Sequence, residues 1–340
     1  MSGHLGSRVA GRLRRGRPRA GLVAVAALAA AGAAVAVPGA AAAATATAPT
    51  AYVVNEGNGT ITPINTATNA AGTAIKVGTG DSPNAIAATP NGATLYVTNG
   101  GNGTITPIST ATNTAGTPIP VGPDPTAIAI SPNGATAYVA SPGTVTPVNL
   151  ATNTAGTPIT AGNGDAIAIS PNGATVYVTT LNEVIPIDTA TNTAGTPIPA
   201  GTGPFAIAIT PNRATAYVTD QYKHQVVVIN TATNTVSTRI ALTGDALGLA
   251  VTPNGATVYL AGYGLGTVTP ISTATNTAGT PIKAGGGPFA IAITPNGATA
   301  YVTDFDTDTV TPISTATNTA GTPIAMPAGA HATAIVIAGG

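Results

Sequence analysis

The sequence contains no cysteine and no tryptophan, and charged residues make up only 6% of its 340 residues. Without cysteine, thiol catalysis, disulfide bonds and a lipid anchor attached through a cysteine are excluded. The absence of tryptophan argues against a carbohydrate-binding platform. Beyond residue 50, every stretch long enough for a helix carries β-branched alternation or a glycine or proline, so we expect no helices there.

The few charges are distributed unevenly along the chain. Six of the eleven basic residues lie before residue 20, whereas all eleven acidic residues lie beyond residue 55. The remainder therefore has five basic and eleven acidic residues, a net charge of −6 (5 − 11). Five scattered cations cannot follow a phosphate backbone, so nucleic acid is not an expected partner.

The N-terminal segment has the three parts of a secretory signal. A basic run is followed by an apolar stretch over 20–37, and then by Pro38 and small residues. We expect residues 1–44 to be a cleaved signal peptide, residues 45–50 a short linker, and the protein to be secreted or held at the cell surface. The alternative is an uncleaved anchor, because about 18 apolar residues nearly span a bilayer. The pair Arg14-Arg15 leaves both general and twin-arginine export open.

The rest of the chain repeats with a period of about 42 residues. Four kinds of segment recur: a tyrosine followed by Val or Leu, a short apolar run such as 127–130, a segment like 104–108, and a segment of the Gly-Thr-Pro-Ile type, as at 116–119. Four strand-like segments per period are the signature of a propeller blade. The repeat tyrosines are Tyr52, Tyr96, Tyr138, Tyr177, Tyr217, Tyr259 and Tyr301.

The turns within a period are specified by their residues. Proline fixes the first corner of the Pro-Asn-Gly turn, as at 90–92, and glycine accepts a positive φ. One feature conflicts with ideal blades, since the third strand carries a proline in six repeats, as at Pro107. Because proline offers no N–H, we expect a bulge or early termination of that strand and a thin fourth strand.

The two ends of the repeat array are complementary. The array begins at the tyrosine strand over 51–54 without a preceding apolar strand, and the sequence finishes with an apolar strand over 334–337. We therefore predict that residues 51–340 form an all-β, seven-bladed β-propeller of four-stranded antiparallel blades. The C-terminal strand would join the N-terminal blade and close the ring, which removes two exposed edges.

The segment Tyr96-Val97-Thr98-Asn99, preceded by Pro90-Asn91-Gly92, resembles the repeat of the YVTN-family β-propellers, which occur in surface-layer and other exported proteins. The resemblance covers residues 51–340, although the third-strand proline stands where the family often has valine. It implies the fold and says almost nothing about function, because the matching residues form strands and turns. Related propellers include lactonases and streptogramin lyases, so the resemblance leaves an enzyme open.

Because residues that recur in every blade have a structural explanation, a functional site must lie in the departures from the repeat. These departures fall in the loops between the second and third strands and in the loops that lead into each blade, and together they make one face acidic. We expect this face to bind an unknown protein, glycan or small molecule. The candidate ligand-face residues are Tyr222, Lys223, His224, Phe205, Phe289, Asp81, Asp165 and Asp245.

The densest acidic cluster is Asp304, Asp306 and Asp308. Alternate carboxylates suit Ca²⁺, a hard cation that takes oxygen ligands. The run lacks the glycine and glutamate of an EF-hand loop, so the choice is between a Ca²⁺ site and a solvated acidic turn. No other cofactor is expected.

His224 and His331 are the only histidines beyond the leader. A general base for a hydrolase or lyase would have to be one of them. The alternative for both is a solvated loop residue. No Gly-x-Ser-x-Gly elbow is present, so a serine hydrolase is not indicated.

The aromatic residues outside the repeat lie in the same loops. Seven of the nine tyrosines belong to the repeat and should pack between blades with their hydroxyls reaching backbone groups. The other aromatics could line a shallow pocket: Phe205, Phe289, Tyr222, Tyr263 and Phe305. The sequence thus favours a monomeric, non-enzymatic scaffold or binding module over a metal-assisted hydrolase or lyase that uses His331 and His224 at the channel mouth.

Overall fold

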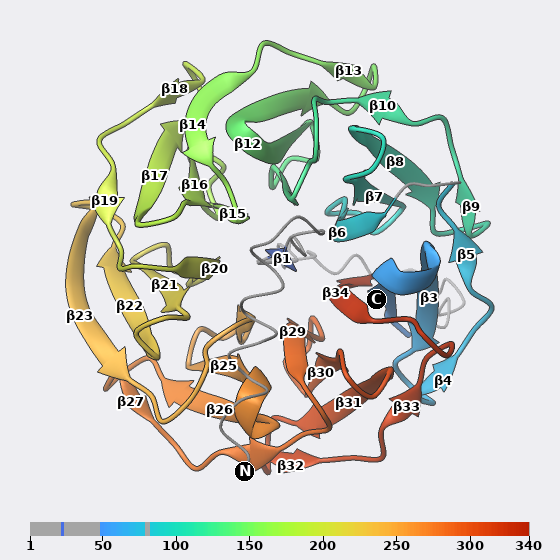
Figure 1. The fold of residues 1–340 in the computed structure, drawn as a ribbon, viewed down its shortest axis with the longest axis vertical. Helices are drawn as coiled ribbons and strands as arrows, with labels where there is room; N and C mark the ends of the chain where they lie inside the picture. The colour runs from blue at the N-terminus through green and yellow to red at the C-terminus, as the bar shows by residue number, and fades with distance from the viewer. Residues whose placement is uncertain (1–21, 24–47, 79–81, 340) are drawn as a thin grey trace, which may run out of the picture.

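The computed structural model describes residues 22–23, 48–78 and 82–339. The predicted signal peptide and linker lie almost entirely outside these residues. Seven small sheets surround a central channel, and each sheet is one blade (Figure 1). No helix of the described part is long and apolar enough to cross a membrane. The prediction of an all-β, seven-bladed propeller is confirmed.

The innermost strand of each blade lines the channel. These strands are rich in Ala and Ile, which are short or β-branched and fit a narrow, buried ring. From blade 2 through blade 7 and back to blade 1 they are β6 (Pro83–Ala88), β11 (Ala127–Ile130), β15 (Ala166–Ile169), β20 (Pro204–Ile209), β24 (Leu249–Val251), β29 (Pro288–Ile293) and β34 (Ala332–Ala338). At the centre of the ring, β1 (Leu22–Val23) pairs in parallel with β15.

The second strand carries the repeat tyrosine. In blades 1 to 7 this strand is β2 (Thr50–Asn55), β7 (Thr94–Asn99), the first half of β12 (Thr136–Asn149), β16 (Thr175–Thr179), β21 (Thr215–Asp220), β25 (Thr257–Gly262) and β30 (Thr299–Asp304). Two short 3-10 helices, η1 (Glu56–Asn58) and η2 (Tyr263–Leu265), follow β2 and β25.

The third strand runs without interruption through its proline. It comprises β3 (Thr60–Asn65), β8 (Thr104–Ser109), the second half of β12, β17 (Glu183–Asp188), β22 (Gln225–Asn230), β26 (Thr267–Ser272) and β31 (Thr309–Ser314). Pro63 stands opposite Tyr52 in an unbroken register, and its carbonyl accepts the N–H of Gly72 on the outer side. The N–H and C=O groups of one strand residue point to the same side. Because the carbonyl of Pro63 points to the outer strand, the N–H that proline lacks would also have pointed there, and the pairing with β2 is unaffected. The expected bulge or early termination of the third strand is therefore wrong, whereas the thin fourth strand is confirmed.

The outer strand is split into two short pieces in six blades and is continuous in blade 5. The pieces are β4 (Ala70–Ala71) and β5 (Ile75–Lys76), β9 (Thr114–Ala115) and β10 (Ile119–Pro120), β13 (Thr154–Ala155) and β14 (Ile159–Asn163), β18 (Thr193–Ala194) and β19 (Ile198–Pro199), β27 (Thr277–Ala278) and β28 (Ile282–Lys283), and β32 (Thr319–Ala320) and β33 (Ile324–Ala325). In blade 5, β23 (Thr235–Ala241) is one strand of 7 residues.

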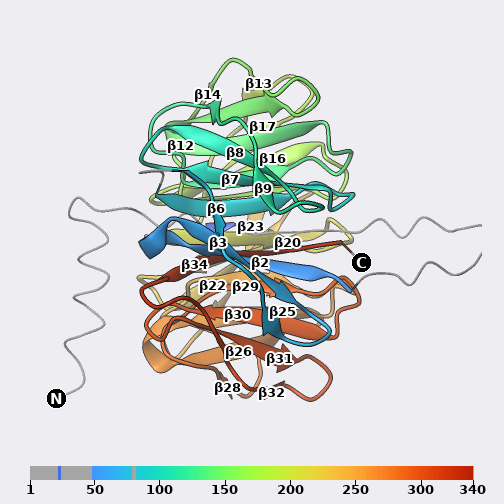
Figure 2. The ribbon, with the colours of Figure 1, turned by 90° about the vertical axis from the view of Figure 1, so that its right-hand side faces the viewer.

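The ring is closed by the pairing that the two ends predict. β34 pairs antiparallel with β2 from Thr50↔Ala338 to Asn55↔Ala332, and both strands lie side by side in blade 1 (Figures 1 and 2). The innermost strand of blade 1 therefore comes from the C-terminal end of the chain, and the other strands come from its N-terminal part.

The core lies between blades. One cluster, for example, combines Val54 and Ile61 of blade 1 with Ile86, Leu95 and Ile108 of blade 2, all with no exposed surface. The repeat tyrosines are 1–4% exposed, so their rings belong to these layers. Each blade buries its faces against two neighbours, which makes the ring interdependent.

Hydrogen bonds from the tyrosine hydroxyls also join neighbouring blades all around the ring. Each hydroxyl donates to the side-chain oxygen of an asparagine in the next blade, at 2.6–3.2 Å, and Tyr301 of blade 7 bonds Asn69 of blade 1. All seven asparagines have φ between 53° and 56°, a region that asparagine tolerates. The predicted backbone acceptor is thus an asparagine side chain, with an added backbone carbonyl at Tyr177, Tyr259 and Tyr301.

Candidate functional site

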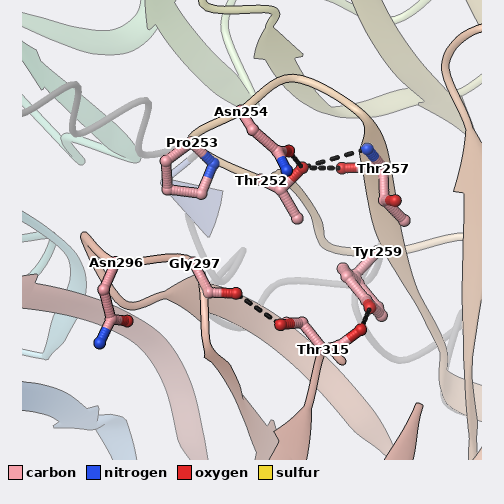
Figure 3. A pocket seen from close by; sticks show the side chains of 8 residues that line it. All are labelled: Thr252, Pro253, Asn254, Thr257, Tyr259, Asn296, Gly297 and Thr315. Carbon is pink, nitrogen blue, oxygen red and sulfur yellow. Dashed lines mark hydrogen bonds between the residues drawn. The ribbon is translucent and has the colours of Figure 1, made fainter. Parts of the chain in front are cut away.

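The two faces of the ring differ in the turns and loops that they carry. The turn face carries the Pro-Asn-Gly turns and the turns between the third and outer strands, and the C-terminal end reaches it, because Gly339 lies against Gly92. A groove of about 410 Å³ on this face lies between the turns of blades 6 and 7 (Figure 3). Its lining consists of repeat residues such as Thr252, Asn296 and Tyr259. The groove is therefore a seam between blades and not a departure from the repeat.

The opposite face, which we call the variable face, carries the loops between second and third strands and the loops that enter each blade. Backbone hydrogen bonds join the two kinds of loop: Gln221 N–H to Gly203 O at 3.0 Å, and Phe305 N–H to Gly287 O at 2.9 Å. In blade 1, Gly57 N–H reaches Ala330 O at 2.9 Å. Side chains from separate parts of the sequence are thereby held next to one another.

Four aromatic rings and one imidazole form a continuous group on this face, which we call the aromatic row: Phe205, Phe289, Phe305, His331 and Tyr263. Ring centroids are 6.0 Å apart for Phe205 and Phe289, and 5.8 Å apart for Phe289 and Phe305. Phe305 is stacked on His331 at 4.9 Å and lies 6.4 Å from Tyr263. The row thus spans blades 5, 6 and 7 and reaches the loop before the closing strand β34.

Exposure varies along the aromatic row. Phe289 is buried, with 3% of its surface exposed. Phe205, Tyr263 and Phe305 are half-buried, and His331 is exposed. The row therefore presents ring surface to solvent while its base is fixed in the core.

Asp306 fixes one end of this group. Its Oδ1 accepts the hydroxyl of Tyr263 at 2.7 Å. Burial, together with the hydrogen bond to the carboxylate and its negative charge, raises the pKa of Tyr263 well above its usual value. Gly287 leaves the necessary space, because a Cβ there would lie 2.8 Å from Asp306 Oδ2 and 2.9 Å from Tyr263 Cε2.

Asp308 fixes the position of His331, the other neighbour of Phe305 at this end of the group. Its Oδ1 accepts the N–H of His331 at 2.8 Å, and its Oδ2 accepts the N–H of Gly329 at 2.7 Å. Both Asp308 and His331 have positive φ, at 50° and 47°. The carboxylate therefore holds the loop in the conformation that stacks His331 on Phe305.

Asp304 is buried, whereas Asp306 is exposed and Asp308 is partly exposed. Asp304 has no exposed surface, and its Oδ2 accepts the hydroxyls of Thr309 at 3.1 Å and Thr311 at 2.6 Å. Burial raises its pKa to about 6 against the lowering effect of these two hydrogen bonds. Within the described residues no group of three or more His, Asp or Glu side chains is arranged to hold a metal. The Ca²⁺ site stays a prediction.

A second polar group lies in the loops of blades 5 and 6. His224 Nδ1 is 3.2 Å from Asp245 Oδ1, with both side chains partly exposed. Tyr222 is 39% exposed and lies over Gly203, where a Cβ would approach the ring to 2.3 Å. Lys223 is exposed. A groove of about 160 Å³ begins at Asp245 and is lined on its apolar side by Leu242, Leu260 and Leu265.

The remaining candidates stand apart from these two groups. Asp165 is half-buried at the start of β15 in blade 4, and its N–H donates to Thr179 O at 2.9 Å. Asp81 lies outside the described residues. Glu56 in η1 is not among the site residues that the sequence predicts, but burial raises its pKa to about 7.

Comparison with known proteins identifies the fold alone. No protein-family model matches the chain, and no curated protein matches it. A solved structure of Kuenenia stuttgartiensis hydrazine synthase matches with a TM-score of 0.72 and 22% identity, covering 83% of this chain and 99% of that chain. A functionally unknown protein from Desulfotomaculum acetoxidans matches with a TM-score of 0.75 and 17% identity, covering 85% and 99%. The chain is thus a seven-bladed β-propeller, and its function has to be inferred from its own residues.

Proposed function

We propose that this protein is an exported propeller of the YVTN type that binds a partner through its variable face. The observation that carries the proposal is the aromatic row. Five rings from three blades and the closing loop lie together, and Asp306 and Asp308 fix Tyr263 and His331 among them, although the repeat itself needs none of these rings. Half-buried rings next to carboxylates are suited to a ligand that has both an apolar surface and hydrogen-bond donors.

The ligand class is a protein, a glycan or a small molecule, and a binding screen with a matched pair of variants tests the proposal. The secreted chain is screened against peptide, glycan and metabolite panels by thermal shift, because a ligand that binds only the folded state raises the melting temperature. Phe305→Ala and His331→Ala should each weaken the binding of a hit about tenfold or more. Thr157→Ala, at an exposed residue between β13 and β14, should leave it unchanged. Hits that bind equally well to all three variants would contradict the proposal.

Export has its own test. The basic run and apolar stretch over 1–44 would direct secretion and be removed. Expression in a bacterial host followed by fractionation should place the protein outside the cytoplasm, with a mature N-terminus near residue 45. Retention in the cytoplasm at full length would contradict the signal-peptide assignment and would leave the binding proposal standing.

A metal-assisted hydrolase or lyase is the second candidate, and the contact between His224 and Asp245 favours it. A carboxylate on Nδ1 orients an imidazole so that Nε2 can accept a proton from water, and the groove beside Asp245 offers space for a small substrate. In a screen of lactones and esters with Ca²⁺ present, His224→Gln should then reduce turnover about 100-fold or more. Activity that persists in His224→Gln would exclude this role for the residue.

A further inference from the structure

The outer edge of blade 5 differs from the outer edges of the other six blades. Among the outer strands of the described ring, only β23 is continuous over 7 residues, and it forms a long arrow at the outside of blade 5 in Figure 1. In each other blade, two short pieces replace it. Blade 5 therefore presents the longest regular edge on the rim of the described ring.

The cause is the loss of two prolines in the same blade. Val228 stands opposite Tyr217, where the other blades place their third-strand proline. Arg239 occupies the outer-strand position at which five blades have the proline of Gly-Thr-Pro-Ile: Pro118, Pro158, Pro197, Pro281 and Pro323. Proline on an outer strand removes an N–H and hinders the addition of another strand. This protection is missing in blade 5.

The unprotected edge is accessible. Thr238, Arg239 and Ala241 are exposed, and β23 is the last strand of its sheet, paired with β22. A register shift opposite Val228 and Ile229 accommodates Ser237, after which residues 238–241 pair regularly with β22. Four consecutive residues thus offer alternate backbone N–H and C=O groups to an additional strand.

Positive charge follows this edge from one face to the other. Arg213 lies on the turn face of blade 5, where its carbonyl accepts the hydroxyl of Thr231, a residue of the turn that leads from β22 to β23. Arg239 lies within β23, with Nη2 3.5 Å from Pro199 O. Lys223 lies near the end, next to His224, whose carbonyl accepts the N–H of Leu242 at 2.8 Å.

Among the described residues these three exposed cations form no ion pair with a carboxylate, although Asp245 contacts His224, the neighbour of Lys223. They are three of the five basic residues beyond the leader. Over residues 204–241 the only carboxylate is that of Asp220, which has no exposed surface and accepts a hydrogen bond from Gln225 Nε2 at 3.0 Å. The outer strand of blade 5 therefore carries a positive charge and no carboxylate, although the chain beyond the leader is acidic.

We propose that β23 is a docking edge for an extended, acidic segment of a partner protein, which adds to blade 5 as a further strand. The exposed backbone of residues 238–241 supplies the hydrogen bonds, as in β-augmentation. Arg213, Arg239 and Lys223 select carboxylates and accelerate the encounter. This edge is on the rim of the ring, so the proposal does not depend on the ligand of the variable face.

The test uses a fluorescent eight-residue peptide in which glutamate alternates with valine and threonine, titrated into the full chain and followed by anisotropy. Binding should be saturable and should weaken as salt is added. Two matched peptides, one with lysine for glutamate and one with every second amide N-methylated, should bind about tenfold more weakly or worse. Hydrogen exchange at residues 238–241 should slow on binding of the first peptide.

Two variants of the edge and one control locate the site. Arg239→Pro restores the residue that five other blades carry, so the blade should still fold, and the peptide should lose about tenfold or more in affinity. Arg239→Glu should lose about fivefold or more. Lys76→Glu alters an exposed cation on the outer strand of blade 1 and should change affinity less than about twofold.

Three results would overturn the proposal. One is equal binding of the N-methylated peptide, which would show that charge alone is recognised. Another is an equal loss of affinity in Lys76→Glu. The third is a dimer in sedimentation without peptide that Arg239→Pro dissociates, since a second copy of the chain would then occupy the edge.

Discussion

At the scale of single residues, the repeat tyrosine and the turn asparagine work as a pair across blades. The tyrosine hydroxyl reaches an asparagine that lies 54–61 residues further along the chain in six pairs, whereas Tyr301 reaches back to Asn69. A buried hydroxyl without a partner would be costly. The pair thus joins each blade to the next.

We predict that Tyr301→Phe lowers the free energy of unfolding by about 1 kcal/mol, since it removes the bond that joins blade 7 to blade 1. Urea denaturation followed by circular dichroism measures the change. Thr157→Ala, at an exposed residue between β13 and β14, should change stability by less than about 0.5 kcal/mol. Equal stability of Tyr301→Phe and wild type would show that the hydroxyl bond is not part of the joint.

Asp304 occupies a position where two other blades have asparagine. Asn55 Nδ2 donates to Thr60 at 3.0 Å and Thr62 at 2.8 Å, and Asp304 accepts hydrogen bonds from the equivalent threonines. The carboxylate of Asp304 thus forms hydrogen bonds with the same two threonine positions as the amide of Asn55, but in its ionised form it is also a buried charge. Its pKa of about 6, against a usual value of 3.8, expresses that cost.

A raised pKa in the folded state means that the folded protein binds the proton more tightly than the unfolded chain. The stability that Asp304 contributes is complete below about pH 4 and is lost as the pH rises toward 6. Asp304→Asn should therefore stabilise the protein by about 2–3 kcal/mol at pH 8 and have little effect at pH 3.5. Urea denaturation over this pH range measures the difference, and a gain independent of pH would contradict the assignment. Glu56, with its pKa of about 7, should leave some pH dependence in the variant.

At the scale of strands, proline decides whether a blade has a complete outer strand. The third-strand proline keeps its pairing with the tyrosine strand because its missing N–H faces outward. In blade 5, Val228 restores that donor, and Thr238 pairs with it. Proline in the third strand thus accompanies a split outer strand, and valine at the same position accompanies a continuous one.

We predict that Val228→Pro splits β23 and costs about 1–3 kcal/mol, since a ladder hydrogen bond is lost. Hydrogen exchange at residues 236–239 should accelerate at the same time. The reverse change in blade 2, Pro107→Val, should alter stability by less than about 0.5 kcal/mol, because Pro118 still interrupts the outer strand there. An unchanged exchange rate in Val228→Pro would contradict this explanation of the split strands.

Strand positions were predictable because tyrosine, apolar runs and Pro-Asn-Gly turns recur with a fixed period. The tyrosine–asparagine pairs were missed because both residues have a complete explanation within one blade, although both occur seven times. The loops were predicted to hold a shallow aromatic pocket, and Phe205, Phe289 and Phe305 do lie together. The contact between His224 and Asp245 could not be predicted, since it depends on how loops of neighbouring blades are placed.

At the scale of the whole molecule, the ring is one interdependent unit that closes through β34. This strand supplies seven buried residues to blade 1, and it joins the last blade to the first through its register with β2. The aromatic row depends on the same closure, because His331 lies in the loop before β34. Stability and the candidate site are therefore linked.

Removal of residues 332–340 tests this account most directly, with the melting temperature and the number of transitions in calorimetry as the measurement. We predict a fall of more than about 15 °C in a transition that involves the whole ring, because blade 1 loses its innermost strand. Addition of a peptide covering 330–340 should restore part of the loss, and removal of residues 339–340 alone should have no effect. An unchanged melting temperature in the 332–340 deletion, or a separate small transition with the main one unaltered, would contradict a ring closed by its last strand.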